Sequence, residues 1–113
     1  MGLKVAVATK GSKGLEDKVS EVFGRSQTFT IVNTDGDKIK KANVVENPAK
    51  SYEYGAGPIA TKMLTDMRVK VVIGAEFGVG VSNLLKSKNI RAVKVNAGTN
   101  VCRAVDNVIK GIK

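Results

Sequence analysis

The chain has 113 residues, a size that supports one domain around a single hydrophobic core. It carries 19 lysine and arginine residues against 10 aspartate and glutamate residues, a net charge of +9, with no histidine and one cysteine, Cys102. The absence of an imidazole excludes Ser-His-Asp and Cys-His catalytic systems and Cys/His zinc sites. A single cysteine cannot form an intramolecular disulfide, which favours a reducing compartment. No apolar stretch approaches the roughly 18 residues of a membrane span. We therefore expect a cytoplasmic protein.

The first half of the chain predicts strands. Three segments have the apolar or alternating pattern of β-strands: residues 3–8, 27–33 and 38–46. The first is apolar enough to be covered on both faces, and the third is rich in lysine, as an edge strand often is. Gly36 favours a tight hairpin between the second and third strands. We expect one helical turn at residues 19–23, after a loop rich in glycine and lysine.

The second half alternates helices with strands. Strands are predicted at residues 69–74 and 90–95. Helical spacing of apolar residues predicts one helix from Gly55 to Met67, one that begins near Val81, and a last one whose apolar stripe runs from Val101 to Ile112. The order β-β-β-α-β-α-β-α predicts a mixed sheet with helices packed on its faces.

Glycine-rich turns before two of these helices are the first candidate binding features. Gly55-Ala56-Gly57 and Gly78-Val79-Gly80 let the backbone approach a ligand at a helix N-terminus, where free N–H groups favour anions. Both turns should lie at the carboxyl edge of the sheet, the usual ligand edge of such folds. The alternative is that the glycines only permit tight turns and close packing, since neither turn matches a nucleotide-binding motif.

Cys102 is the only soft metal ligand in the chain. With Thr99 as the N-cap it would be the third residue of the last helix; the alternative is a partly buried, inert thiol.

Glu76 stands alone after the fourth strand, and the first strand has no carboxylate, which disfavours a two-metal nuclease.

Positive charge is concentrated toward the C-terminus, where residues 86–113 carry seven cations against Asp106 alone. A small anionic ligand, a nucleic acid and a merely solvated basic face all fit this charge. The five aromatic residues do not have the spacing of a base-stacking platform, so nucleic-acid binding is the alternative hypothesis.

In chain order, the motifs resemble the dinitrogenase iron-molybdenum cofactor biosynthesis family, which includes NifX, NafY and the C-terminal part of NifB. The resemblance covers essentially the whole chain as a single domain, residues 1–113. It rests on a KVAVAT-type first strand, VSEVFGRS at residues 19–26, an Asp-Gly hairpin, ENPA at 46–49, GAG at 55–57 and VKVVIG at 69–74.

The resemblance implies a ribonuclease H-like, three-layer α/β fold with a mixed five-stranded sheet in the order 3-2-1-4-5 and helices on both faces. It also implies a non-enzymatic carrier that binds an iron–molybdenum or iron–sulfur cofactor, or its precursor, and exchanges it with a donor or recipient protein. We expect a monomer or a weak homo-oligomer. The alternative is a nucleic-acid-binding module of the same fold without nuclease activity.

Cofactor-handling relatives commonly have histidine directly before the Phe-Gly pair, where this chain has Val22. We therefore expect an anionic metal–sulfur cofactor to be held by charge and backbone donors rather than by an imidazole. The residues predicted to bind it are Phe23, Gly24, Arg25, Gly55, Ala56, Gly57 and Cys102.

Overall fold

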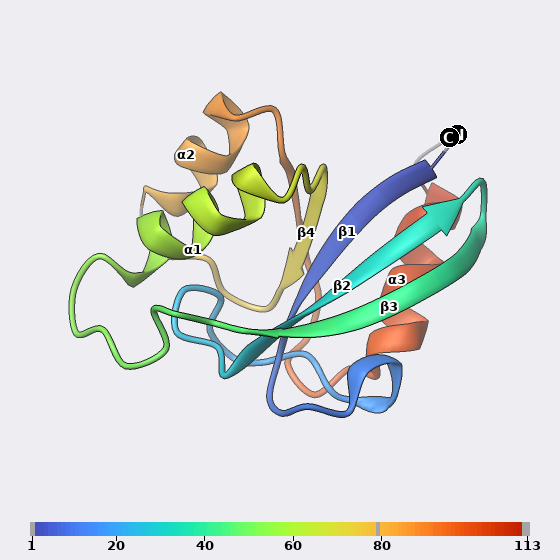
Figure 1. Cartoon of the computed structure of the whole chain (residues 1–113), viewed down its shortest axis with the longest axis horizontal. Coiled ribbons are helices and arrows are strands. Elements are labelled where there is room, and N and C mark those ends of the chain that lie inside the picture. Colours follow the sequence, from blue (N-terminus) through green and yellow to red (C-terminus); the bar gives the residue numbers. More distant parts are fainter. Residues whose placement is uncertain (1, 79, 112–113) are drawn as a thin grey trace.

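The computed structural model describes residues 2–78 and 80–111, in which five strands and three α-helices form layers (Figure 1). The elements are β1 (Gly2–Thr9), a 3₁₀ turn (Gly14–Glu16), β2 (Thr28–Asp35), β3 (Lys38–Glu46), α1 (Ala56–Asp66), β4 (Val71–Gly74), α2 (Val81–Ser87), β5 (Arg91–Lys94) and α3 (Val101–Gly111). Three residues used in the sequence interpretation lie outside the described part: Val79 of the second glycine turn, Ile112 of the last apolar stripe and Lys113 of the basic segment.

The sheet has the order β3-β2-β1-β4-β5, which confirms the predicted order. β1 pairs antiparallel with β2 and parallel with β4, β3 pairs antiparallel with β2, and β5 pairs parallel with β4. Gly36, with φ of +64°, permits the short turn between β2 and β3. Because β1, β3, β4 and β5 run in one direction, the segments that follow them all begin at the same edge of the sheet.

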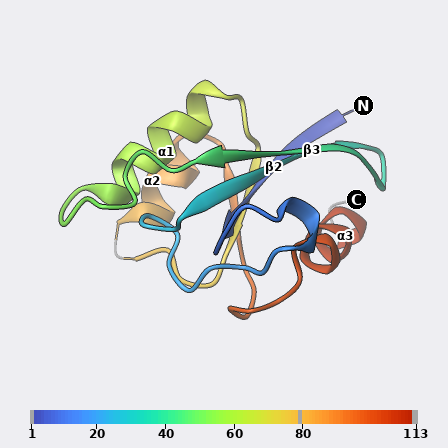
Figure 2. The same ribbon diagram turned by 60° about the horizontal axis from the view of Figure 1, so that its bottom comes forward.

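Helices cover both faces of the sheet, as predicted. Figure 2 shows α1 and α2 on one side of the strands and α3 on the other. β1 serves both layers: the small side chains of Ala6 and Ala8 face α1 and α2, while Val5 and Val7 pack in the cluster under α3. In the described part of the chain, no helix is long and apolar enough to cross a membrane.

The helical turn predicted at residues 19–23 is wrong. Val19 instead forms an isolated antiparallel bridge with Thr9, and the Ser20 N–H donates to the Ala8 carbonyl at 2.8 Å. This extended path allows Val19 to enter the apolar cluster under α3 and Phe23 to enter the cluster under α1 and α2. Burying two large apolar side chains on opposite faces outweighs a weak local preference for helix.

Asn100, and not Thr99, caps α3. The Asn100 Oδ1 accepts a hydrogen bond from the Arg103 N–H at 3.0 Å, while the Thr99 hydroxyl donates to the Asn96 carbonyl at 2.6 Å. Cys102 is therefore the second residue of the helix and not the third.

Candidate functional site

A pocket of about 350 Å³ lies beside α1 and α2 at the carboxyl edge of the sheet. Three stretches of chain that are far apart in sequence form it: residues 22–25 between β1 and β2, residues 56–58 in the first turn of α1, and residues 76–78 together with Val81 around the start of α2. The parallel strands bring these stretches together because each stretch lies at the same edge.

Phe23 anchors the first of these stretches. Its ring is fully buried, with centroids 5.3 Å from the rings of both Phe29 and Phe77. Its backbone N–H donates to the carbonyl oxygen of Glu76 at 2.9 Å. Phe23 therefore ties residues 22–25 to the β4–α2 connection, and its ring supports the pocket wall from within the core.

Two glycines, Gly24 and Gly57, allow the chain segments that form the pocket walls to pack closely against each other. A Cβ atom on Gly24 would lie 2.9 Å from the backbone nitrogen of Gly57, and a Cβ atom on Gly57 would lie 2.4 Å from Cγ2 of Val81. Both distances are shorter than an ordinary van der Waals contact, so a Cβ atom at either position would force the neighbouring atoms to move. The loop after β1, the first turn of α1 and the start of α2 are thus in direct contact only because these two positions lack a side chain.

The side chain of Asn47 fixes the loop that contains Gly24. Its side chain is almost fully buried, and its Nδ2 donates to the carbonyl oxygens of Gly24 and Ser26, both at 2.9 Å. Its Oδ1 accepts a hydrogen bond from the Ala49 N–H at 3.0 Å. A single side chain therefore fixes the backbone of residues 24–26 relative to the segment that leads to α1.

The first turn of α1 supplies backbone N–H groups that can donate hydrogen bonds to a ligand. Gly55 is its N-cap in the left-handed conformation, with φ of +75°, and no side chain caps the helix. Pro58 has no N–H, so the N–H groups of Ala56 and Gly57 are the ones that this turn presents beside the pocket.

Charged groups border the pocket. The exposed side chains of Arg25 and Glu76 both line it, and in the described residues neither forms an ion pair. An adjoining pocket of about 320 Å³ shares Glu76 and Phe77 and adds Lys94. Two cations and one carboxylate therefore surround this edge, which gives it a positive balance.

The structure brings together five of the seven residues that were predicted to bind the cofactor: Phe23, Gly24, Arg25, Ala56 and Gly57 all line this pocket. Gly55 directly precedes them as the N-cap of α1. Cys102 does not join them, because it lies on α3, which packs against the opposite face of the sheet. The alternative of a partly buried, inert thiol is wrong about burial, since Cys102 is exposed.

Several pocket residues were missed by sequence reasoning. Phe77 was considered only as one of the five aromatic residues, Val81 only as the start of a helix, and Glu76 only as a lone carboxylate for metal chemistry. Asn47 was visible only as part of the ENPA motif, although an asparagine before proline at the end of a strand is a signal for a side chain that bonds to the backbone.

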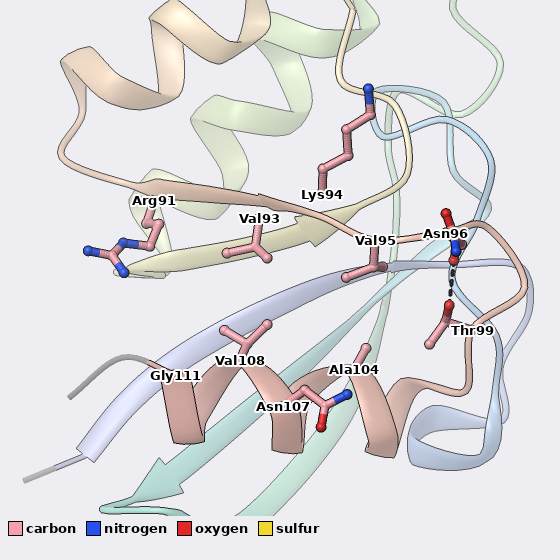
Figure 3. Close-up of a pocket in the computed structure, with 10 residues that line it drawn as sticks. All are labelled: Arg91, Val93, Lys94, Val95, Asn96, Thr99, Ala104, Asn107, Val108 and Gly111. Carbon is pink, nitrogen blue, oxygen red and sulfur yellow. Dashed lines mark hydrogen bonds between the residues drawn. The ribbon is translucent and has the colours of Figure 1, made fainter.

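A larger groove of about 580 Å³ lies elsewhere, between β5 and α3, and none of the predicted site residues lines it (Figure 3). Size alone would select this groove. The smaller pocket is the candidate cofactor site because the motif residues converge there.

Comparison with known proteins agrees with the resemblance seen in the sequence. The model of the family described as dinitrogenase iron-molybdenum cofactor matches residues 1–111. An uncharacterized protein of Methanocaldococcus jannaschii is 27% identical over 94 residues, which are 83% of this chain and 75% of that protein.

Two solved structures are similar over almost the whole chain. The apo form of the orange protein from Desulfovibrio gigas has 26% identity and a TM-score of 0.86, covering 96% of this chain and 88% of that one. An NMR structure from Thermotoga, described as a candidate NifB protein, has 28% identity and a TM-score of 0.77, covering 96% of this chain and 89% of that one.

Proposed function

The chain belongs to the dinitrogenase iron-molybdenum cofactor family, and from that premise we propose that it is a small carrier of an anionic metal–sulfur cofactor or its precursor. The observation that carries the proposal is the pocket beside α1 and α2. There two of the motifs that make the resemblance specific, VSEVFGRS and GAG, meet around one cation and two backbone N–H donors.

The pocket suits an anion that keeps its own metal–sulfur bonds. In the described part of the chain, no group of three or more His, Cys, Asp or Glu residues could hold a metal ion. The pocket offers the guanidinium of Arg25 and the N–H groups of Ala56 and Gly57, which donate to the acceptor surface of an anion. Val22, which is 39% exposed, and Phe77 add apolar contact.

The proposal treats the protein as a non-enzymatic accessory protein. The cofactor is cargo, received from one protein and passed to another through the open side of the pocket. The structure of the orange protein is described as an apo form, a term for a protein that also has a loaded form. The ribonuclease H-like name for the fold and a cytoplasmic location are parts of the same proposal.

Anaerobic titration with tetrathiomolybdate, followed by absorbance, tests this function. We expect saturable binding that weakens as the salt concentration rises, because exposed charges are screened. Arg25→Ala should weaken binding about tenfold, since a charge-assisted hydrogen bond is worth roughly 1.5–3 kcal/mol and Arg25 is exposed.

Arg103→Ala is the matched control, because Arg103 is an exposed arginine of α3 that does not line the pocket. It removes the same charge and should change the affinity less than twofold. Cys102→Ala should leave binding intact. Equal losses from the two arginine variants, or binding that disappears only with Cys102→Ala, would contradict the proposed site.

A further inference from the structure

The larger groove has an apolar interior between a strand and a helix. Val93 and Val95 line it on the side of β5, and Ala104 and Val108 line it on the side of α3. Figure 3 shows Val93 and Val108 facing each other across it, with Arg91 at one end and the hydrogen-bonded pair Asn96 and Thr99 at the other. The groove therefore has room for apolar side chains between polar ends.

β5 adds unpaired backbone groups along this groove. It is the last strand of the sheet, and among the described strands its only neighbour is β4. The N–H groups of Arg91 and Val95 donate inward, to the carbonyl oxygens of Lys70 and Gly74, both at 2.9 Å. Hydrogen-bonding groups alternate along a parallel strand, so those of Ala92 and Lys94 point away from β4. An open edge of this kind can accept an extended peptide as a further strand.

The positive charge around β5 and α3 indicates what kind of segment would bind at this edge. From residue 86 to residue 111 there are six cations and one carboxylate, Asp106, which already pairs with Lys110 at 3.1 Å. A second copy of the chain, paired edge to edge, would place two sets of Arg91 and Lys94 side by side, and facing like charges oppose pairing. A segment that carries carboxylates is instead attracted to this edge.

We propose that β5 and the groove between β5 and α3 form a docking surface for an extended acidic segment of a partner protein. Side chains alternate along a strand, so every second residue of the segment enters the groove and must be apolar. The intervening residues are aspartate or glutamate, and they project to the other face of the sheet, on which the side chain of Lys94 lies. Arg91 stands at one end of the groove. This surface shares no lining residue with the proposed cofactor pocket and does not depend on it, although Lys94 also lines the small pocket that adjoins the cofactor pocket.

A peptide titration tests the proposal. The probe is an acetylated and amidated peptide of sequence Ser-Glu-Val-Glu-Val-Asp-Ser, added to the ¹⁵N-labelled chain. We expect saturable shifts of the Ala92 and Lys94 amide resonances, with slower hydrogen exchange at both amides. The same peptide with lysine at its acidic positions should bind at least tenfold more weakly.

Ala92→Pro is the decisive variant, because it removes an N–H that points away from β4 and so leaves the bonds within the sheet in place. It should weaken binding at least tenfold, whereas Ala92→Thr, which keeps the N–H, should bind like the parent chain. Binding that Ala92→Pro leaves unchanged would overturn the proposal. So would peptide-induced shifts centred on Gly24 and Gly57, or self-association through β5 without peptide. Should Ala92→Pro fail to fold, the exchange protection at Ala92 and the lysine peptide decide the question in the parent chain.

Discussion

Asn47→Ala is expected to lower the free energy of unfolding by about 3 kcal/mol. The side chain is 1% exposed and makes three hydrogen bonds to backbone groups, so its removal leaves the carbonyl oxygens of Gly24 and Ser26 and the N–H of Ala49 without this partner. Each lost bond is worth roughly 0.5–1.5 kcal/mol, and a buried group left unpaired costs more. Urea denaturation followed by circular dichroism measures the change.

Asn43→Ala is the matched control. Asn43 lies on the edge strand β3 and is exposed, so the same truncation should change the free energy of unfolding by less than about 0.5 kcal/mol. A loss below about 1 kcal/mol for Asn47→Ala would show that Asn47 does not hold the loop of Gly24. Because this loop forms one wall of the pocket, Asn47→Ala should also weaken tetrathiomolybdate binding in the fraction of protein that stays folded.

Gly57→Ala is the second large effect, with an expected loss of about 2 kcal/mol. The new Cβ would lie 2.4 Å from Cγ2 of Val81, so α1 and α2 must move apart or Val81 must leave its position. Alanine gains up to about 1 kcal/mol of helix propensity over glycine, which offsets only part of this overpacking.

A double-mutant cycle separates this steric clash from other causes. Val81→Ala alone should cost about 2 kcal/mol, because it truncates a buried side chain. In the double variant the alanine at position 57 occupies the space that Val81 vacates, so the combined loss should stay near 2 kcal/mol rather than reach the sum. Additive losses would mean that Gly57 is required for a reason other than its contact with Val81.

The sheet and most of its helices could be predicted because their signals are local. The lysine-rich pattern of residues 38–46 and the turn at Gly36 place β3 within its observed bounds. The buried strand β1 and the amphipathic α3 are similarly evident from spacing alone. Residues 19–23 could not be predicted in this way, because their extended backbone depends on partners in β1 and in the loop before α3.

Sequence motifs predicted individual residues of the site but not how those residues come together. Arg25, Ala56 and Gly57 stood out because they lie in unusual glycine-containing segments. Their convergence with Glu76 and Phe77 depends on how α1 packs against α2, through a contact that spacing does not reveal. Cys102 was included for its chemistry, but helix α3 places it on the other side of the sheet. The groove beside β5 is likewise a product of sheet order.

The central claim is that an anionic metal–sulfur species binds in the pocket beside α1 and α2. Mapping the tetrathiomolybdate titration by ¹H–¹⁵N NMR under anaerobic conditions tests this claim most directly. The account predicts that the amide resonances of Gly24, Arg25, Ala56 and Gly57 shift most and saturate together, while those along β5 and the start of α3 stay in place. Saturable shifts centred on Cys102 or on the groove between β5 and α3 would contradict it.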